Sequence, residues 1–266
     1  MMVKKRADIL LFEKGLVDSR EKGKRLIMEG VVFIGTQRID KPGDYINEEE
    51  ELTIKSNPLI YVSRGGLKLE KAIEVFKLDL KDKIAMDIGA STGGFTDCML
   101  KSGAKKVYAV DVGYNQLDWK IRNDNRVVVM ERTNIRNVKS EDIEDEFDFI
   151  SIDVSFISLK LVLPVAKNLL KNNGEIAALI KPQFEAGRDK VGKKGIVRNK
   201  DIHLEVIKHV IQFAETLGLV PNSLTFSPVT GATGNIEFLI YLKNSGQTID
   251  DKFILDVIEE AHRTLK

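Results

Sequence analysis

The sequence holds one cysteine, Cys98, among 266 residues, so the chain cannot form an internal disulfide bond. A lone cysteine suits a reducing compartment, and we expect Cys98 to be a small buried residue. No run approaches the ~18 apolar residues that a membrane-spanning helix needs. Charges interrupt the chain soon after the basic start Met1–Arg6, so no signal-peptide core forms. These absences predict a cytoplasmic protein with no membrane partner.

An excess of charge of one sign is also missing. The 41 Lys and Arg residues nearly balance the 40 Asp and Glu residues, which leaves a net charge of +1. Any surface that binds nucleic acid must therefore be local. Residues 1–30 carry eight Lys/Arg and five Asp/Glu, and there Arg20, Lys24 and Arg25 share one side of a predicted helix. The charge pattern alone favours a solvated helix face over an RNA-contacting face.

The pattern of apolar residues divides the chain into two parts. Residues 7–16 and 19–30 are predicted helices followed by short strands, and the Asn-Pro pair ending at Pro58 signals a boundary. From residue 84 strands and helices alternate, which indicates a mostly parallel sheet covered on both faces. We predict a small α+β domain at 1–58, a linker at 59–63 and an α/β domain at 64–266. The predicted strands are 84–88, 106–110, 127–130, 147–152, 175–180 and a terminal hairpin of 223–227 and 237–242; the predicted helices are 94–102, 158–171, 201–217 and 250–266.

Four polar residues, Asp87, Asp111, Asp153 and Lys181, fall at or near the carboxyl ends of predicted strands. Ligands of open α/β sheets bind beyond those ends, so these residues indicate a site. Asp111, at the end of the second strand of the α/β part, is placed to accept hydrogen bonds from ribose hydroxyls.

The glycines of "IAMDIGASTGGF", residues 84–95, do not fit the dinucleotide fingerprint G-x-G-x-x-G. Ser91 stands where the second glycine would let the backbone approach a pyrophosphate, and Asp87 would place a negative charge near a phosphate. S-adenosylmethionine carries an ammonium and a sulfonium but no phosphate. The stretch therefore favours S-adenosylmethionine as the cofactor.

Several motifs together resemble a known family. "DIGASTGGF" matches the first motif of Rossmann-like methyltransferases, and "DSREKGKRLIMEGVVFIG" resembles the S4 RNA-binding domain. "SRGGLKL" at 63–69, "DVSFISL" at 153–159, "IKPQFE" at 180–185 and "GNIEFLIYL" at 234–242 resemble the TlyA (hemolysin A-like) family. That family joins an S4 domain to an FtsJ-like 2′-O-ribose methyltransferase, and the resemblance covers nearly the whole chain.

The resemblance implies a Rossmann-like methyltransferase fold with a seven-stranded sheet behind an S4-like domain. It also implies S-adenosylmethionine as cofactor, ribosomal RNA or a ribosomal subunit as partner, and cytidine 2′-hydroxyls as the methylated groups. The catalytic tetrad falls on Lys68, Asp153, Lys181 and Glu237. The cofactor residues are Asp87, Gly89, Ala90, Ser91, Gly93, Gly94, Phe95, Asp111 and Asn134, and the RNA-binding residues of the S4-like part are Arg6, Arg20, Lys24 and Arg25. Independently of the resemblance, the basic, glycine-rich run at 188–195 adds Arg188, Lys193 and Lys194 as candidate RNA-binding residues.

The chemistry of methyl transfer suggests a role for each tetrad residue. Lys181 would be the base or the main orienting group, and Lys68 would stabilise developing alkoxide charge. We expect the two lysines to lower each other's pKa, and Asp153 and Glu237 to hold them.

Plainer interpretations stay open from the pattern alone. Lys68 and Lys71 lie three residues apart on a predicted helix, and either could be a surface charge. Glu237 could be a charge on an edge strand. Asp153 could be a helix N-cap, and Asn134 a turn residue. The basic run at 188–195 is either a mobile loop touching RNA phosphates or a solvated loop.

Other functions predict features that this sequence lacks. An amino-group methyltransferase would carry Asp/Asn-Pro-Pro-Tyr/Phe after the fourth strand, where this chain has Asp153-Val-Ser-Phe156. A lytic protein would need an amphipathic or apolar membrane segment. A non-catalytic RNA-binding protein would have no need of the intact glycine motif and all four tetrad positions.

Overall fold

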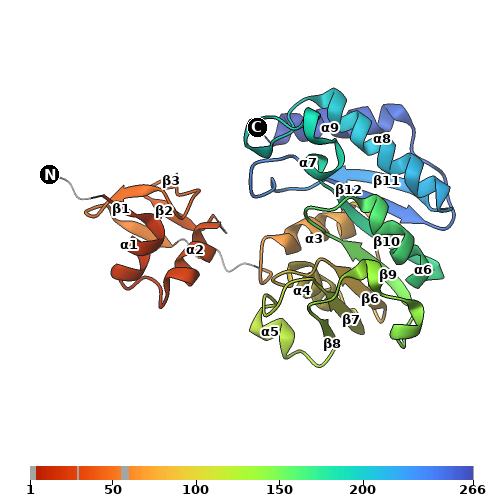
Figure 1. Cartoon of the computed structure of the whole chain (residues 1–266), viewed down its shortest axis with the longest axis horizontal. Helices are drawn as coiled ribbons and strands as arrows, with labels where there is room; N and C mark the ends of the chain where they lie inside the picture. Colours follow the sequence, from red (N-terminus) through yellow and green to blue (C-terminus); the bar gives the residue numbers. More distant parts are fainter. Residues whose placement is uncertain (1–3, 29, 55–59, 266) are drawn as a thin grey trace. The chain divides into compact units, whose positions relative to one another are not determined.

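The computed structural model describes residues 4–28, 30–54 and 60–265. The chain forms two compact units, Met1–Ile60 and Tyr61–Lys266 (Figure 1). Residues 58 and 59, where the predicted first domain ends and the predicted linker begins, lie outside the described residues.

The N-terminal unit packs two helices against short antiparallel strands. Its core includes Leu10 and Leu11 from the first helix, Ile27 from the second, and Val32 and Leu52 from the strands. The first helix is shorter than predicted because Gly15 takes a left-handed conformation (φ +69°) after it. The elements are β1 (Lys4–Arg6), α1 (Ala7–Glu13), α2 (Arg20–Met28), β2 (Val32–Ile34), β3 (Gln37–Arg38), β4 (Tyr45–Asn47) and β5 (Leu52–Ile54), paired as β1-β4 and β3-β2-β5.

The second unit is built on a seven-stranded sheet in the order β11-β12-β10-β9-β6-β7-β8. The five strands from β10 to β8 are parallel, and β12 is antiparallel to both of its neighbours. This confirms the predicted sheet and its terminal hairpin. The strands are β6 (Ile84–Ile88), β7 (Lys106–Val110), β8 (Val127–Met130), β9 (Phe147–Ile152), β10 (Leu170–Ile180), β11 (Val220–Phe226) and β12 (Phe238–Lys243).

Helices cover both faces of this sheet (Figure 1), as strand–helix alternation predicts. On one face α3 and α4 form a core that includes Leu69, Phe95 and Met99, while α6, α8 and α9 pack on the other, with Ile207 and Ile258 buried. The helices are α3 (Gly65–Phe76), α4 (Gly94–Lys101), α5 (Trp119–Arg122), α6 (Leu163–Leu169), α7 (Pro182–Glu185), α8 (Lys200–Thr216) and α9 (Asp251–Thr264). Within the described ranges, none of the helices is both long and apolar enough to cross a membrane.

The helix predicted at 158–171 is wrong at both ends. A short 3-10 turn, Leu159–Leu161, precedes α6, whose first turn contains a proline. At the other end Leu170 already pairs with Phe147 of β9, so β10 begins before the Asn-Asn-Gly stop. Pairing with β9 overrides the local helix signal there, and the register shifts between Leu170 and Glu175.

Candidate active site

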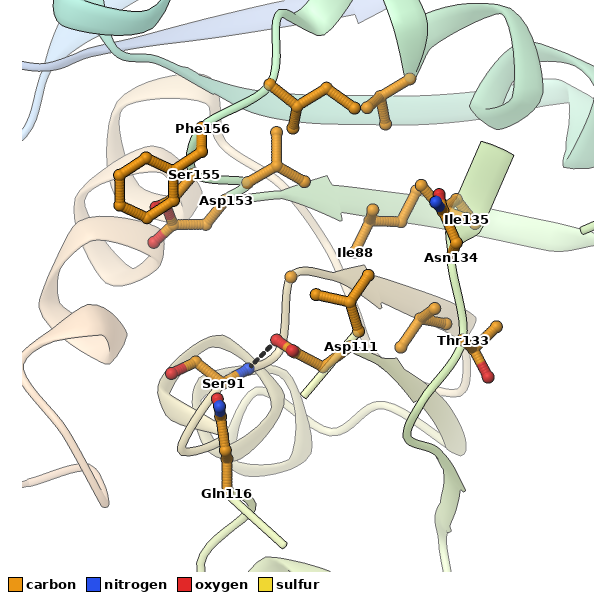
Figure 2. A pocket seen from close by; sticks show the side chains of 16 residues that line it. Ile88, Ser91, Asp111, Gln116, Thr133, Asn134, Ile135, Asp153, Ser155 and Phe156 are labelled. Atoms are coloured by element: carbon orange, nitrogen blue, oxygen red, sulfur yellow. Dashed lines mark hydrogen bonds between the residues drawn. The ribbon is translucent and has the colours of Figure 1, made fainter. Parts of the chain in front are cut away.

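A cavity of about 300 Å³ lies beyond the carboxyl ends of β6, β7 and β9. Of the predicted cofactor residues, Gly89, Ser91, Asp111 and Asn134 line it, and so does Asp153 of the predicted tetrad. Figure 2 shows Ser91 and Asp111 along one side of the cavity and Asp153, Ser155 and Phe156 along another. The topology thus gathers at one place residues that lie far apart in the sequence.

Backbone groups hold the Asp111 carboxylate in place. One oxygen accepts the N–H of Ser91 at 2.8 Å, the bond dashed in Figure 2, and the other accepts the N–H of Gly113 at 2.7 Å. Each carboxylate oxygen can accept a further hydrogen bond, so the group remains able to bind ligand hydroxyls. Gly89 (φ +89°) turns the chain here, and a Cβ on it would lie 2.5 Å from the carbonyl oxygen of Asp153. No larger residue fits that approach.

Asn134 is a turn residue that also lies on the wall of the cavity. Its side-chain oxygen accepts the backbone N–H of Arg136 at 3.2 Å and so caps a 3-10 turn, as a turn asparagine would. The same residue also lines the cavity. The oxygen also accepts from the Nε of Arg136 at 3.2 Å, so a ligand contact would use the amide nitrogen of Asn134.

The other predicted cofactor residues do not line this cavity. Asp87 is fully buried and accepts hydrogen bonds from the hydroxyls of Thr96 (2.7 Å) and Ser151 (3.2 Å). Burial raises its pKa to about 7, against the lowering effect of those bonds. The rest pack inside the unit: Ala90, Gly93, Gly94 and Phe95.

The four predicted catalytic residues form one chain of ion pairs. The Nζ of Lys68 lies 2.7 Å from Glu237 and 3.6 Å from one oxygen of Asp153. The Nζ of Lys181 lies 2.6 Å from the other oxygen of Asp153 and donates to the hydroxyl of Ser155 at 2.9 Å. All four side chains are at most 17% exposed. Two cations and two anions therefore alternate in a largely dry site.

These contacts decide between the alternatives that the sequence left open. Glu237 is 2% exposed and precedes β12, which lies between two other strands, so it is not an edge-strand charge. Asp153 faces the two lysines, and the 3-10 turn after it is capped by Ser158. Lys71 points elsewhere, with its Nζ 3.4 Å from the centre of the Phe226 ring.

The expected mutual lowering of the lysine pKa values is wrong for Lys68. Burial acts to lower its pKa, but the charges of Asp153 and Glu237 outweigh burial and raise the pKa above its ordinary value. For Asp153, burial acts to raise the pKa, and the charges of Lys68 and Lys181 bring it below its usual range. The carboxylates thus keep Lys68 protonated, and the two lysines keep Asp153 ionised.

Three predicted RNA-binding residues of the N-terminal unit make ion pairs within that unit. Arg6 donates two hydrogen bonds to the buried carboxylate of Asp8 at 3.0 and 3.1 Å, and Arg20 lies 3.7 Å from the same group. Lys24 pairs with Glu21 at 2.6 Å. Arg20 is exposed, and so is Arg25, the fourth predicted residue of this group.

The predicted basic loop consists of two 3-10 turns, Arg188–Lys190 and Lys193–Gly195. Arg188, Lys193 and Lys194 are all exposed. Lys194 adopts a left-handed conformation (φ +70°), and Lys190 pairs with Glu205 of α8. The loop therefore presents its cations from a defined backbone.

Two residues of the site were missed in the sequence, although both lie in quoted motifs. Ser155 accepts the hydrogen bond from Lys181. Glu185 accepts from the hydroxyl of Ser158 at 2.7 Å and the N–H of Leu159 at 2.8 Å, which ties α7 to the loop after Asp153. Their distance in sequence from their partners hid these contacts, but a polar residue inside "DVSFISL" or "IKPQFE" was a usable signal.

Comparison with known proteins agrees with this geometry. The family model described as FtsJ-like methyltransferase matches residues 61–244, and that of the S4 domain matches residues 5–52. YqxC of Bacillus subtilis is 55% identical over 99% of this chain and 96% of its own length. The 16S/23S rRNA (cytidine-2′-O)-methyltransferase TlyA of Mycobacterium tuberculosis is 37% identical over 96% of both chains.

A solved structure gives the same result for the fold. A protein of Streptococcus thermophilus is 50% identical, with a TM-score of 0.79 over 99% of this chain and 98% of its own. The S4 domain, the methyltransferase sheet and the relatives spanning both make this chain a member of the FtsJ-like methyltransferase family, within its TlyA-like, S4-containing group.

Proposed function

We propose that this protein transfers the methyl group of S-adenosylmethionine to a ribose 2′-hydroxyl of ribosomal RNA, at a cytidine. The observation that carries the proposal is the ion-pair chain Glu237–Lys68–Asp153–Lys181 at the wall of the cavity, with Asp153 belonging to both. The name of the relative TlyA, an rRNA (cytidine-2′-O)-methyltransferase, supports the choice of RNA and of nucleotide.

The donors and acceptors around the cavity fit the proposed cofactor. The fixed Asp111 carboxylate suits a pair of ribose hydroxyls, and Gly89 and Ser91 leave the backbone open beside it. Asn134 would flank the adenine end, and the ionised Asp153 lies on the opposite side. When bound, the cofactor supplies an already electrophilic methyl group.

The protein's own task is to place the 2′-hydroxyl in line and to weaken its O–H bond. Positioning of this kind contributes roughly 7–11 kcal/mol to such reactions. Lys181 is held by Asp153 and Ser155, so its Nζ has a fixed position from which it would meet the hydroxyl of the substrate. Lys68 stays protonated and stabilises the alkoxide charge that develops on the ribose oxygen.

Asp153 and Glu237 keep the lysine pair electrically balanced until the substrate arrives. Lys181, which shares one carboxylate with Lys68, is the residue we assign as base or principal orienting group.

The surface cations provide the affinity for RNA in this proposal. Arg188, Lys193 and Lys194 of the loop after α7 would contact phosphates, as would Arg6, Arg20, Lys24 and Arg25 of the S4 domain. Contacts to phosphates fix the position of the RNA, and the shape of the folded RNA supplies the specificity.

The test is to incubate the protein with radiolabelled S-adenosylmethionine and unmethylated ribosomal subunits, in parallel with Lys181→Ala and Lys71→Ala. Lys71 serves as the control because it lies outside the ion-pair chain. Alkaline hydrolysis then maps the label, since alkali cannot cleave after a 2′-O-methylated ribose.

Label in an alkali-resistant dinucleotide, lost in Lys181→Ala and kept in Lys71→Ala, is the expected result. Label on a base would reject ribose methylation and the tetrad roles together. No label on either subunit, with cofactor binding intact, would reject ribosomal RNA as the substrate.

A further inference from the structure

Asn235 is a fully buried amide whose hydrogen-bonding groups are nearly all used. Its Nδ2 donates to the carbonyl oxygen of Gly195 at 2.8 Å and to the hydroxyl of Thr233 at 2.9 Å. Its Oδ1 accepts the backbone N–H of Val197 at 2.9 Å. The amide therefore donates to and accepts from the same segment, 195–197, as a paired strand would. An aspartate has no N–H to donate, and an apolar residue can do neither.

This amide joins two parts of the proposed active site. On one side is the backbone that leads out of the basic loop with Lys193 and Lys194. On the other is the turn before β12, where Glu237 follows Asn235 by two residues and bonds Lys68 at 2.7 Å.

The turn lies directly on the catalytic carboxylate. A Cβ on Gly231 would lie 2.5 Å from Glu237, and the N–H of Gly231 donates to the carbonyl oxygen of Asn235 at 2.9 Å. The hydrogen bonds of the Asn235 amide with Gly195 and Val197 thus connect the basic loop to a residue only two positions before Glu237 of the tetrad.

Asn235 holds the end of the loop that follows Lys194, while nearer its start Lys190 pairs with Glu205 of α8. Val197 is 2% exposed, and its carbonyl oxygen contacts the ring nitrogen Nε2 of His203 at 3.2 Å. Lys193 and Lys194, by contrast, are exposed. The position of these cations relative to Glu237 depends on the bonds at Gly195 and Val197.

We propose that Asn235 is a positioning residue for the RNA substrate. It fixes the basic loop at a set distance from the tetrad, so that phosphates bound by Lys193 and Lys194 place the target ribose at Lys181. This inference rests on the proposed function. In this proposal Asn235 affects the binding of RNA and not that of the cofactor, because Asn235 does not line the cofactor cavity.

The test uses Asn235→Ala with Asn222→Ala as a matched control. Asn222 is also an asparagine near β12, and its amide holds a different loop by donating to the carbonyl oxygen of Gln247 at 3.2 Å. For each variant, kcat and KM are measured with ribosomal subunits, together with the Kd for S-adenosylmethionine and the Tm.

Asn235→Ala is expected to raise the KM for the subunit about tenfold, with kcat within about threefold and the cofactor Kd unchanged. Asn222→Ala is expected to leave both kinetic constants near those of the parent protein. In addition, Asn235→Ala should raise the KM little further when it is combined with Lys193→Ala and Lys194→Ala, because all three changes act through the same loop.

A fully additive triple variant, or an unchanged KM in an active Asn235→Ala protein, would overturn the inference and leave the proposed function standing. An equal loss of cofactor affinity would also overturn it, since it would indicate general damage to the fold. A parent protein that methylates neither subunit would reject the proposed function, and the inference with it.

Discussion

Asp8 in the N-terminal unit and Asp87 in the methyltransferase unit are both fully buried carboxylic acids, yet their pKa values move in opposite directions. Hydrogen bonds from the Arg6 guanidinium lower the pKa of Asp8, which burial alone would raise. Asp87 has uncharged partners, the hydroxyls of Thr96 and Ser151 and the backbone N–H of Thr96, and burial raises its pKa to about 7. Burial alone therefore does not determine the charge of an acid; the presence of a cation does.

Asp153 extends this comparison to the active site. It too is largely buried, and the charges of Lys68 and Lys181 keep its pKa low. The two lysines of this site need ionised carboxylates to balance their charge. Asp87, beneath the glycine turn, contacts hydroxyls instead of a cation and has no charge to balance. Changing each acid to its amide tests what its charge contributes.

The largest effect is expected from Asp153→Asn. The change leaves Lys181 without its carboxylate and removes one of the two carboxylates near Lys68, so methylation should fall about a thousandfold. The rate is measured with labelled cofactor and ribosomal subunits. The control is Asp148→Asn, because Asp148 lies on β9, the strand that leads to Asp153, pairs with Lys171 at 2.8 Å and takes no part in the tetrad. Equal activity of both variants would contradict the assignment.

Asp87→Asn should change how stability depends on pH. An acid whose folded pKa is raised stabilises the fold below its unfolded pKa, and that stability is lost as pH rises through the folded value. Between pH 4 and about 7 the free energy of unfolding of the parent protein should fall by up to about 4 kcal/mol relative to that of the variant. Urea unfolding at several pH values measures the difference. A constant difference across this range would mean that Asp87 is ionised throughout.

A smaller effect of the opposite sign is expected for Asp8→Asn. A carboxylate with a lowered pKa stabilises the fold above its unfolded pKa, and that stability is lost as pH falls through the folded value. At pH 7 the variant should destabilise the N-terminal unit by about 1–3 kcal/mol.

Hydrogen exchange of the peptides that cover α1 and α2 reports this loss. Asp18→Asn is the comparison, since its pair with Lys22 is exposed to solvent and should contribute little to stability. If the two variants show the same hydrogen exchange, the buried ion pair of Asp8 contributes no more to stability than the exposed pair of Asp18.

The smallest effect on stability is expected for Lys24→Ala, because the pair with Glu21 lies on the surface. RNA binding should nevertheless change. If Lys24 contacts a phosphate, the slope of log K against log salt should become shallower by about 1. Filter binding over a salt series measures it, with Lys22→Ala as a control on the same helix. An unchanged slope would remove Lys24 from the RNA-binding set.

The sheet was predictable because each central strand is a short apolar run bounded by polar residues. Strands such as 106–110 and 147–152 agree with the structure to the residue. The three-residue strands β1 and β4 were not predicted, because they contain lysine and asparagine and have no alternation to detect. The start of β10 was missed because long-range pairing with Phe147 decided it.

The tetrad residues were identified by motif resemblance, and the structure brings them together. What the sequence could not give is the order of charges, and with it the raised pKa of Lys68. Nor could it show that Asp87 faces Thr96 and Ser151, or that Asn235 bonds a loop about forty residues away. Each of these depends on which side chains meet across the fold, and local periodicity does not record that.

Gly94 gives the glycine motif a second task. A Cβ on this residue would lie 2.3 Å from the hydroxyl of Ser63 and 2.9 Å from the backbone nitrogen of Gly66, at the start of the helix that carries Lys68. The last glycine of the motif therefore sets how closely two helices approach, and with it the depth of Lys68. To transfer the glycine turn 89–94 to another protein, the "SRGGLKL" segment would have to be transferred with it, because the two segments pack directly against each other.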